Sequence, residues 1–253
     1  MTPTDVPEFG VPGVSIYSLK YWSRGILVQG YLDVPAGKGP FPLLVFLHGG
    51  YLVPSQLRHV YLVDSLQLID PMQWASYRMI AFLPSYAGYG SSGGNVGSLA
   101  SNATDTLNGI IALRQVCGLH IRPQATYLLG GSMGGGVAVY VAERDRGIRA
   151  AVLISPGLFN SPYWEQEYYN LKLPVLILAG TQDPIVTPAL AVATYDALSA
   201  HDKKVRLMWE PGGHYPLAAS WHDLTDWFAS YGLTFVQSLS TRAPHIRMCP
   251  AQP

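Results

Sequence analysis

A serine between glycines, Ser132 in the stretch GGSMG at 130–134, is the residue of this sequence best suited to nucleophilic chemistry. Residues 125–129 before it form a short apolar run, and residues 137–142 after it are small and apolar. This pattern predicts a strand, a sharp turn and a helix, with the serine at the turn. The glycines let the backbone fold back without a Cβ collision, so the hydroxyl projects above a sheet edge and can attack a carbonyl carbon. The same short pattern also occurs at tight packing corners that have no chemistry.

A serine hydroxyl becomes an effective nucleophile when a histidine takes its proton and a carboxylate orients that histidine. The candidates are Asp183, which follows the apolar run 175–178, and His214, which follows the run 205–209. Loops that follow parallel strands meet at one edge of the sheet, so Ser132 and these two residues are predicted to come together. Taken alone, Asp183 before a proline is typical of a turn or a helix cap. The order of the three residues, each after a strand, favours catalysis.

Acyl transfer also needs two backbone amides that stabilise the developing oxyanion. Met133 directly follows the serine and begins the predicted helix, so its amide is one candidate. The second candidate is the amide of Gly50, in the segment HGGY at 48–51 that follows an apolar run. His48 is interpreted as a residue that braces this loop, and Tyr51 as a substrate-binding residue that lines the pocket.

The elements expected to hold these residues alternate along the chain. Apolar and β-branched runs predict eight strands, at residues 14–19, 25–34, 42–47, 78–83, 125–129, 150–154, 174–179 and 204–209. Helices are predicted at residues 55–76, 98–117, 132–146, 188–200 and 216–231. Alternation of this length predicts an α/β fold with a mostly parallel eight-stranded sheet and helices on both of its faces.

The composition limits the partners of the chain. It has 253 residues, of which 49% are hydrophobic and 13% charged, and its formal net charge is zero. An average globular protein has about 25% charged residues, so this surface is sparsely charged or partly covered by another subunit, and a homo-oligomer stays open. A neutral chain lacks the electrostatic field that would attract nucleic acid or an anionic membrane. Apolar runs stay shorter than 18 residues, so no transmembrane helix is expected.

The first residues, MTPTDVP, have neither a basic start nor an apolar core, so no signal peptide is expected and the predicted location is cytoplasmic. The two cysteines, Cys117 and Cys249, lie far apart, and free thiols in a reducing compartment are the default expectation. Because repeats and linker-like stretches are absent, a single domain is predicted over 1–253, with loosely packed ends at 1–13 and 234–253.

The sequence resembles the α/β-hydrolase superfamily over nearly its whole length. Three stretches carry the resemblance, at 39–50, 84–90 (PSYAGYG) and 179–183 (AGTQD). They are similar to the catalytic domain of the prolyl-oligopeptidase and acylaminoacyl-peptidase group, and to small esterases related to that group. The resemblance implies an α/β-hydrolase fold with Ser132 as nucleophile, Asp183 as acid, His214 as base and an oxyanion amide at Gly50.

Departures from the family pattern favour a small esterase over a peptidase. The chain leaves no room for the large propeller of the peptidases. Tyr86 and the two residues after it stand where relatives often place an arginine. Tyr51 stands where relatives usually have a proline after the histidine and two glycines. We therefore expect a serine carboxylesterase for small to medium apolar acyl or aryl substrates, working on small molecules without cofactor or metal. The alternative enzyme is an aminopeptidase or acylaminoacyl-peptidase for short peptides. The alternative from another class is a non-catalytic, ligand-binding member of the fold.

Aromatic residues in the connector 156–173 predict a minimal cap over the site. The connector contains Phe159 and Trp164, which we expect, with Tyr86, to line an open aromatic cleft and bind substrate. The alternative for most of these rings is packing over the edge of the sheet.

Overall fold

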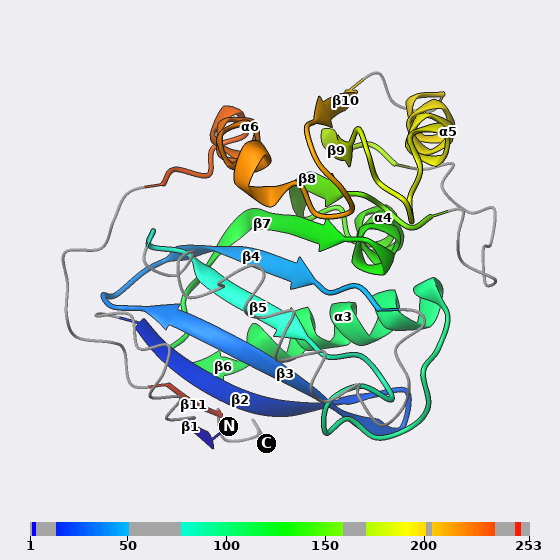
Figure 1. Cartoon of the computed structure of the whole chain (residues 1–253). Helices are drawn as coiled ribbons and strands as arrows, with labels where there is room; N and C mark the ends of the chain where they lie inside the picture. The colour runs from blue at the N-terminus through cyan, green and yellow to red at the C-terminus, as the bar shows by residue number, and fades with distance from the viewer. Residues whose placement is uncertain are drawn as a thin grey trace.

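The computed structural model describes residues 2–3, 14–50, 77–158, 171–200, 204–235 and 246–248. Their strands form a nine-stranded sheet in the order β1-β2-β3-β5-β4-β7-β8-β9-β10 and a two-stranded sheet of β11 and β6 (Figure 1). The strands are β1 Thr2–Pro3, β2 Val14–Ser23, β3 Ile26–Pro35, β4 Phe41–Leu47, β5 Ile80–Pro84, β6 Val116–Cys117, β7 Ile121–Gly131, β8 Ile148–Ile154, β9 Val175–Gly180, β10 Val205–Glu210 and β11 Arg247–Met248. The helices are α3 Leu99–Leu113, α4 Met133–Arg144, α5 Pro188–Ser199 and α6 Leu217–Ser230.

The large sheet is parallel where the candidate site residues lie. Strands β5, β4, β7, β8, β9 and β10 pair in parallel, whereas β1, β2 and β3 extend the sheet in antiparallel pairs beyond β5. The prediction of a mostly parallel sheet with eight strands is confirmed, and the two-residue β1 adds a ninth strand at the edge. Because β4, β7, β9 and β10 run in the same direction, the loops that follow them leave from one edge of the sheet.

Strand β4 shows why the sheet is buried on both faces. All seven of its residues are buried, and they alternate between two apolar cores. Leu43, Val45 and Leu47 belong to the core shared with α3, α4 and α5. Leu44 and Phe46 belong to the core shared with α6. A continuous apolar run is what a strand between two helical layers requires, and the helices cover both faces as predicted (Figure 1).

Some predicted boundaries differ from the observed ones. The helix predicted at 98–117 ends at Leu113, and its expected last residues form β6 instead. The helix predicted at 55–76 lies outside the described residues. Of the ends predicted to pack loosely, Thr2–Pro3 pairs with β2 and Arg247–Met248 pairs with β6, and loose packing of the ends stays a prediction. Within the described ranges, no helix has the length and apolar character that crossing a membrane requires.

The expectation of free thiols is wrong for Cys117, which is disulfide-bonded. The sequence contains one other cysteine, Cys249, which lies outside the described residues. Met248, directly before it, pairs with Val116, directly before Cys117, in the β6–β11 ladder. Disulfides are rare in cytosolic proteins, so the thiols give no support to the cytoplasmic location, which stays a prediction.

Reduction of this disulfide is expected to lower the free energy of unfolding by about 2–5 kcal/mol, because the bond closes a long loop and restricts the unfolded chain. Urea unfolding with and without a reductant measures the difference. Cys117→Ser and Cys249→Ser should each reproduce the loss, and the double variant should add nothing further. A stable Cys249→Ser variant beside a destabilised Cys117→Ser variant would show that Cys117 bonds to a different partner.

Candidate active site

Ser132 lies on the sharp turn between β7 and α4, in a backbone conformation that residues with a Cβ rarely adopt. Its φ is 53° and its ψ is −121°. The Ser132 amide donates to the Ile154 carbonyl at 2.9 Å, and the Ser132 carbonyl accepts from the Gly135 and Gly157 amides at 2.9 and 2.8 Å. Between residues 125 and 142, Ser132 is the only residue that is not buried. The turn therefore presents this one side chain above the sheet edge.

The glycines around Ser132 are required by space. A Cβ on Gly134 would collide with the carbonyl of Leu47, at the end of β4. A Cβ on Gly130 would collide with the carbonyl of Gly134. Helix α4 consequently begins in direct contact with the backbone of β4, which brings the candidate nucleophile close to the loop that contains Gly50.

Asp183 and His214 form a hydrogen-bonded pair. Nδ1 of His214 lies 2.8 Å from Oδ2 of Asp183 and 3.1 Å from Oδ1. The amides of Ile185 and Val186 donate to Oδ1 at 2.8 and 2.9 Å, so the turn after Asp183 fixes the carboxylate. The Asp183 side chain is fully buried, whereas that of His214 keeps 15% of its surface exposed. A carboxylate that holds Nδ1 leaves Nε2 as the nitrogen able to accept a proton.

The electrostatics of Asp183 suit this pairing. Burial raises the pKa of its carboxyl, but the hydrogen bonds from His214 and the Ile185 amide outweigh burial and hold the pKa below its usual value. Asp183 is therefore ionised at neutral pH and can stabilise an imidazolium on His214.

Gly49 brings the neighbourhood of Ser132 together with that of His214. A Cβ on Gly49 would lie 3.1 Å from Cβ of Ser132 and 2.7 Å from the hydroxyl of Tyr215. The Tyr215 ring meets the imidazole of His214 edge to face, with 4.7 Å between the ring centroids. The nucleophile turn, the loop after β4 and the histidine loop thus meet at one point of the sheet edge.

The two candidate oxyanion amides come from the loop after β4 and the start of α4. Gly50 has a φ of 110°, which glycine adopts readily. Met133 is the first residue of α4, where the helix itself provides no partner for the N–H. His48 is fully buried, with Nδ1 at 2.7 Å from the Gly49 carbonyl and Nε2 at 3.2 Å from the Ser85 carbonyl. Burial lowers the pKa of His48 to about 4, so a neutral, buried His48 fits the role of a loop brace.

The predicted substrate-binding residues are only partly visible. Tyr86 is fully buried, has a φ of 55°, and stacks on His48 with 4.3 Å between ring centroids. Its contacts are those of a residue that supports the loop from below, and its place in a substrate pocket stays a prediction. Tyr51, Phe159, Trp164 and the central part of the predicted cap lie outside the described residues.

Two tyrosines that contact this site were not singled out as functional in the sequence. Tyr89 donates its hydroxyl to the Gly50 carbonyl at 2.6 Å. Tyr215 has its ring against Gly131 and its hydroxyl against Gly49. The available signals were the position of Tyr89 between two glycines and the position of Tyr215 directly after the candidate base.

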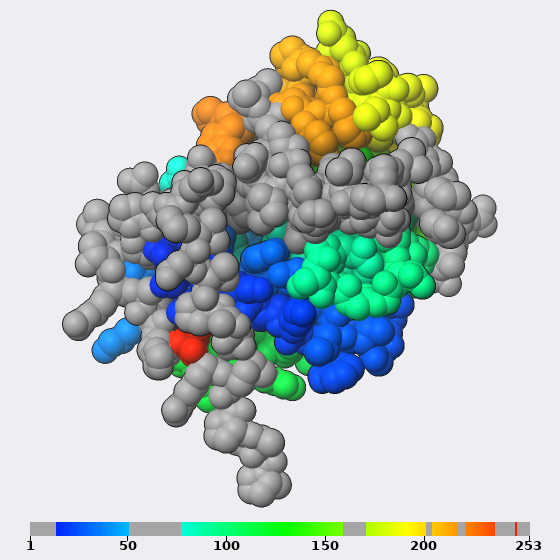
Figure 2. Space-filling view, turned by 60° about the horizontal axis from the view of Figure 1, so that its bottom comes forward, coloured from blue at the N-terminus to red at the C-terminus, as the bar shows by residue number. Residues whose placement is uncertain are grey.

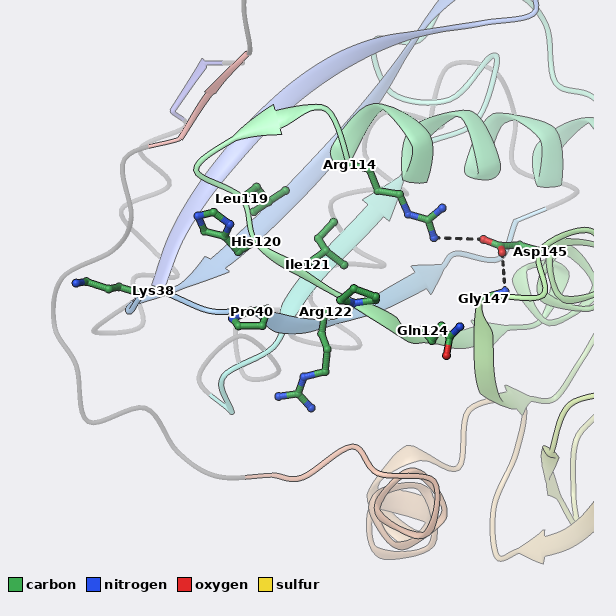
Figure 3. Close-up of a pocket in the computed structure, with 11 residues that line it drawn as sticks. Lys38, Pro40, Arg114, Leu119, His120, Ile121, Arg122, Gln124, Asp145 and Gly147 are labelled. Atoms are coloured by element: carbon green, nitrogen blue, oxygen red, sulfur yellow. Dashed lines mark hydrogen bonds and ion pairs between the residues drawn. The ribbon is translucent and has the colours of Figure 1, made fainter.

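A large cavity lies at the other end of the sheet. It has a volume of about 760 Å³ and is lined by residues at the beginnings of β4 and β7 and at the end of α3, including Lys38, Arg114 and Arg122. Figure 3 shows these three cationic groups pointing away from one another, with Arg114 directed at Asp145. The cavity is therefore separate from the Ser132 neighbourhood. Within the described part of the chain, no group of three or more His, Cys, Asp or Glu side chains could hold a metal ion.

The parallel sheet, the covering helices and the loops that meet at one sheet edge define an α/β-hydrolase. A family model for PETase, described as PET hydrolase-like, matches residues 98–249, more than half of the sequence. The chain belongs to this family, which confirms the expectation of a hydrolase. The matched region contains Ser132, Asp183 and His214, whereas Gly50 lies outside it.

A curated relative shows a weaker similarity. It is a Bacillus subtilis (strain 168) protein described as the uncharacterized peptidase YtmA, 27% identical over 147 residues. The match covers 57% of this chain and 51% of the relative, so it spans about half of the relative's length.

Solved structures of esterases share the fold at low sequence identity. The Pyrococcus furiosus esterase Pf2001 superposes with a TM-score of 0.65 at 15% identity, over 91% of this chain and 94% of its own. Est1E from Butyrivibrio proteoclasticus with ferulic acid bound gives 0.64 at 19% identity, over 84% and 98%. The acetyl xylan esterase from Paenibacillus sp. R4 gives 0.64 at 23% identity, over 90% and 86%.

Proposed function

We propose that this chain is a serine esterase in which Ser132, His214 and Asp183 act as nucleophile, base and orienting acid. The observation that carries the proposal is the pair of His214 and buried Asp183 at the sheet edge where strained Ser132 is partly exposed. A carboxylate–imidazole pair needed only for stability would not have to lie at the same sheet edge as a strained serine. Perturbed and strained groups that gather at one place are typical of catalytic sites.

The proposed reaction is acyl transfer in two steps. Ser132 Oγ attacks the ester carbonyl while Nε2 of His214 takes the hydroxyl proton, and the tetrahedral oxyanion accepts hydrogen bonds from the Gly50 and Met133 amides. His214 then protonates the departing alcohol, which leaves an acyl group on Ser132. Water attacks this acyl-enzyme with His214 as base again, and the carboxylic acid is released while the proton returns to the serine.

The proposed substrates are esters of small to medium apolar acyl or aryl acids. The description of the family as PET hydrolase-like and the ferulic acid bound to Est1E both support aromatic carboxylic esters. A peptidase is the second candidate, because the curated relative is described as one. The homo-oligomer, the single domain and the open cleft stay predictions.

A substrate panel and a covalent probe test the proposal. Nitrophenyl esters of rising acyl length should turn over faster than aminoacyl nitroanilides, because esters have the better activated carbonyl and leaving group. A fluorophosphonate should add its phosphonyl group to Ser132, which mass spectrometry of the digested protein locates. Faster turnover of the anilides would favour the peptidase, and a chain that is neither labelled nor active on any ester would favour the non-catalytic binder.

A further inference from the structure

Gly50 lies between two peptide groups whose carbonyl oxygens are each within hydrogen-bond distance of a side chain, and the Gly49 oxygen accepts when the proton of His48 is on Nδ1. The Gly49 carbonyl, which belongs to the same peptide as the Gly50 N–H, lies 2.7 Å from Nδ1 of His48. The Gly50 carbonyl, in the next peptide, accepts from the Tyr89 hydroxyl at 2.6 Å. Glycine has more backbone freedom than any other residue. These two contacts therefore restrict rotation on both sides of Gly50, whose backbone would otherwise be the freest to move.

Tyr89 also contacts the second candidate oxyanion residue. Its hydroxyl lies 3.8 Å from the Met133 sulfur, so one buried oxygen touches both Gly50 and Met133. The Tyr89 side chain is completely buried, and its ring meets the His48 ring edge to face at 5.0 Å between centroids. Tyr89 therefore joins the loop after β4 to the Met133 side chain at the start of α4.

The loop that carries Tyr89 is itself held on both sides. The Gly93 amide donates to the Leu27 carbonyl at 2.8 Å, and the Ala87 amide donates to the buried Asp105 carboxylate at 3.0 Å. Asp105 also accepts two bonds from the Arg24 guanidinium, at 3.0 and 2.8 Å. Figure 2 shows this segment after β5, in blue-green, lying against the blue hairpin of β2 and β3. A hydroxyl on such an anchored loop has little freedom to move.

We propose that Tyr89 is a positioning residue that holds Gly50 and Met133 in the geometry for oxyanion binding. The proposal rests on the esterase mechanism above and adds a residue to it. Oxyanion stabilisation depends on donors that are already oriented before charge develops. Without the hydroxyl, the Gly50 carbonyl loses its donor and the adjoining peptides can rotate. The transition state then loses stabilisation, whereas the substrate, whose carbonyl is still planar, binds as before.

Tyr89→Phe tests this role, because it removes the hydroxyl and keeps the ring that packs on His48. We expect kcat for a nitrophenyl ester to fall about 10- to 100-fold, less than the 10²- to 10³-fold typical of deleting a donor, with KM nearly unchanged. Affinity for phenylboronic acid, which forms a tetrahedral adduct with the serine, should fall by the same factor as kcat/KM. If the role of Tyr89 were only structural, the loss in kcat/KM and the loss in affinity for phenylboronic acid would not be equal.

Tyr127→Phe is the matched control. Tyr127 is also buried, and its hydroxyl also donates to a backbone carbonyl, that of Tyr231 at 2.9 Å, in the core beneath α6. This variant should lose stability but keep both kcat and boronate affinity. Assays are run well below the melting temperature of each variant, so that unfolding does not imitate a catalytic loss.

Three outcomes separate this proposal from the proposed function. Unchanged kcat in Tyr89→Phe overturns the positioning role while leaving the esterase intact. A lower kcat with unchanged boronate affinity also overturns it, because the oxyanion geometry would then be unaffected. Undiminished hydrolysis by a protein without the Ser132 hydroxyl would instead overturn the esterase mechanism itself.

Discussion

Ser132→Ala is expected to lower kcat for ester hydrolysis by roughly 10⁴- to 10⁶-fold, because no other group can form the acyl-enzyme. The substrate should still bind, since the cleft and the oxyanion amides stay in place. Residual turnover would come from positioning and oxyanion stabilisation of direct attack by water. Steady-state hydrolysis of a nitrophenyl ester, with protein made free of wild-type contamination, measures the loss.

A serine elsewhere supplies the control. Ser199→Ala, at the end of α5, removes a hydroxyl that donates to the Asp196 carbonyl at 3.3 Å, outside the proposed site, so its activity should match the wild type. Hydrolysis that stays at wild-type rates in Ser132→Ala would remove Ser132 from the mechanism.

The backbone strain at Ser132 can be measured separately, from the free energy of unfolding of variants at this position. Alanine retains a Cβ at φ 53°, so Ser132→Ala should be about as stable as the wild type. Glycine adopts this conformation without a steric penalty, so Ser132→Gly should raise the free energy of unfolding by about 1 kcal/mol. Urea unfolding of the two variants compares them directly.

Asp183→Asn is expected to lower kcat by about 10⁴-fold, although it is nearly isosteric. The carboxylate accepts from Nδ1 of His214 at 2.8 Å and leaves Nε2 free to take the serine proton. An amide in its place can donate to Nδ1, which selects the wrong tautomer and removes the charge that stabilises the imidazolium. Single-turnover and steady-state hydrolysis measure the loss, with the thermal melt as a check on folding.

Asp145→Asn is the matched control for this charge. Asp145 also has a carboxylate with a backbone donor, the Gly147 amide at 2.7 Å, but its side chain is 20% exposed and it lines the cavity at the opposite end of the sheet. Its activity should be that of the wild type. If Asp183→Asn and Asp145→Asn lose activity equally, the loss is a general effect of charge and Asp183 has no special role.

Asp183 also predicts a dependence of stability on pH. Its pKa in the folded protein lies below the ordinary value of 3.8, so the unfolded chain takes up the proton first as the pH falls. The stability that Asp183 contributes is therefore complete above its ordinary pKa and is lost as the pH falls through the folded-state pKa. Asp183→Asn should lack this part of the acid dependence.

The sheet and the residues at its edge were predictable because each leaves a local signal. Continuous apolar runs such as Phe41–Leu47 mark strands buried on both faces, and the glycines around Ser132 mark the turn. Asp183 and His214 could be placed beside each other because both follow parallel strands. Their hydrogen bond agrees with that prediction.

The features that could not be predicted depend on contacts between distant segments. A two-residue strand such as β6 has no periodic pattern, and its partner β11 lies far along the chain, so neither the end of α3 at Leu113 nor the disulfide was foreseen. The stacking of Tyr86 on His48, and the positive φ of Tyr86, also leave no signal in the sequence. The bond from Tyr89 to Gly50 likewise joins two loops whose approach only the folded sheet determines.

The strained conformation of Ser132 sets stability against activity at a single residue. A single change to glycine at this turn would abolish the chemistry and improve folding at the same time. Drift under selection for stability alone would therefore be expected to erase the serine. A serine at a position where folding prefers glycine is what a site that uses the hydroxyl would require, and a scaffold that only has to fold would not.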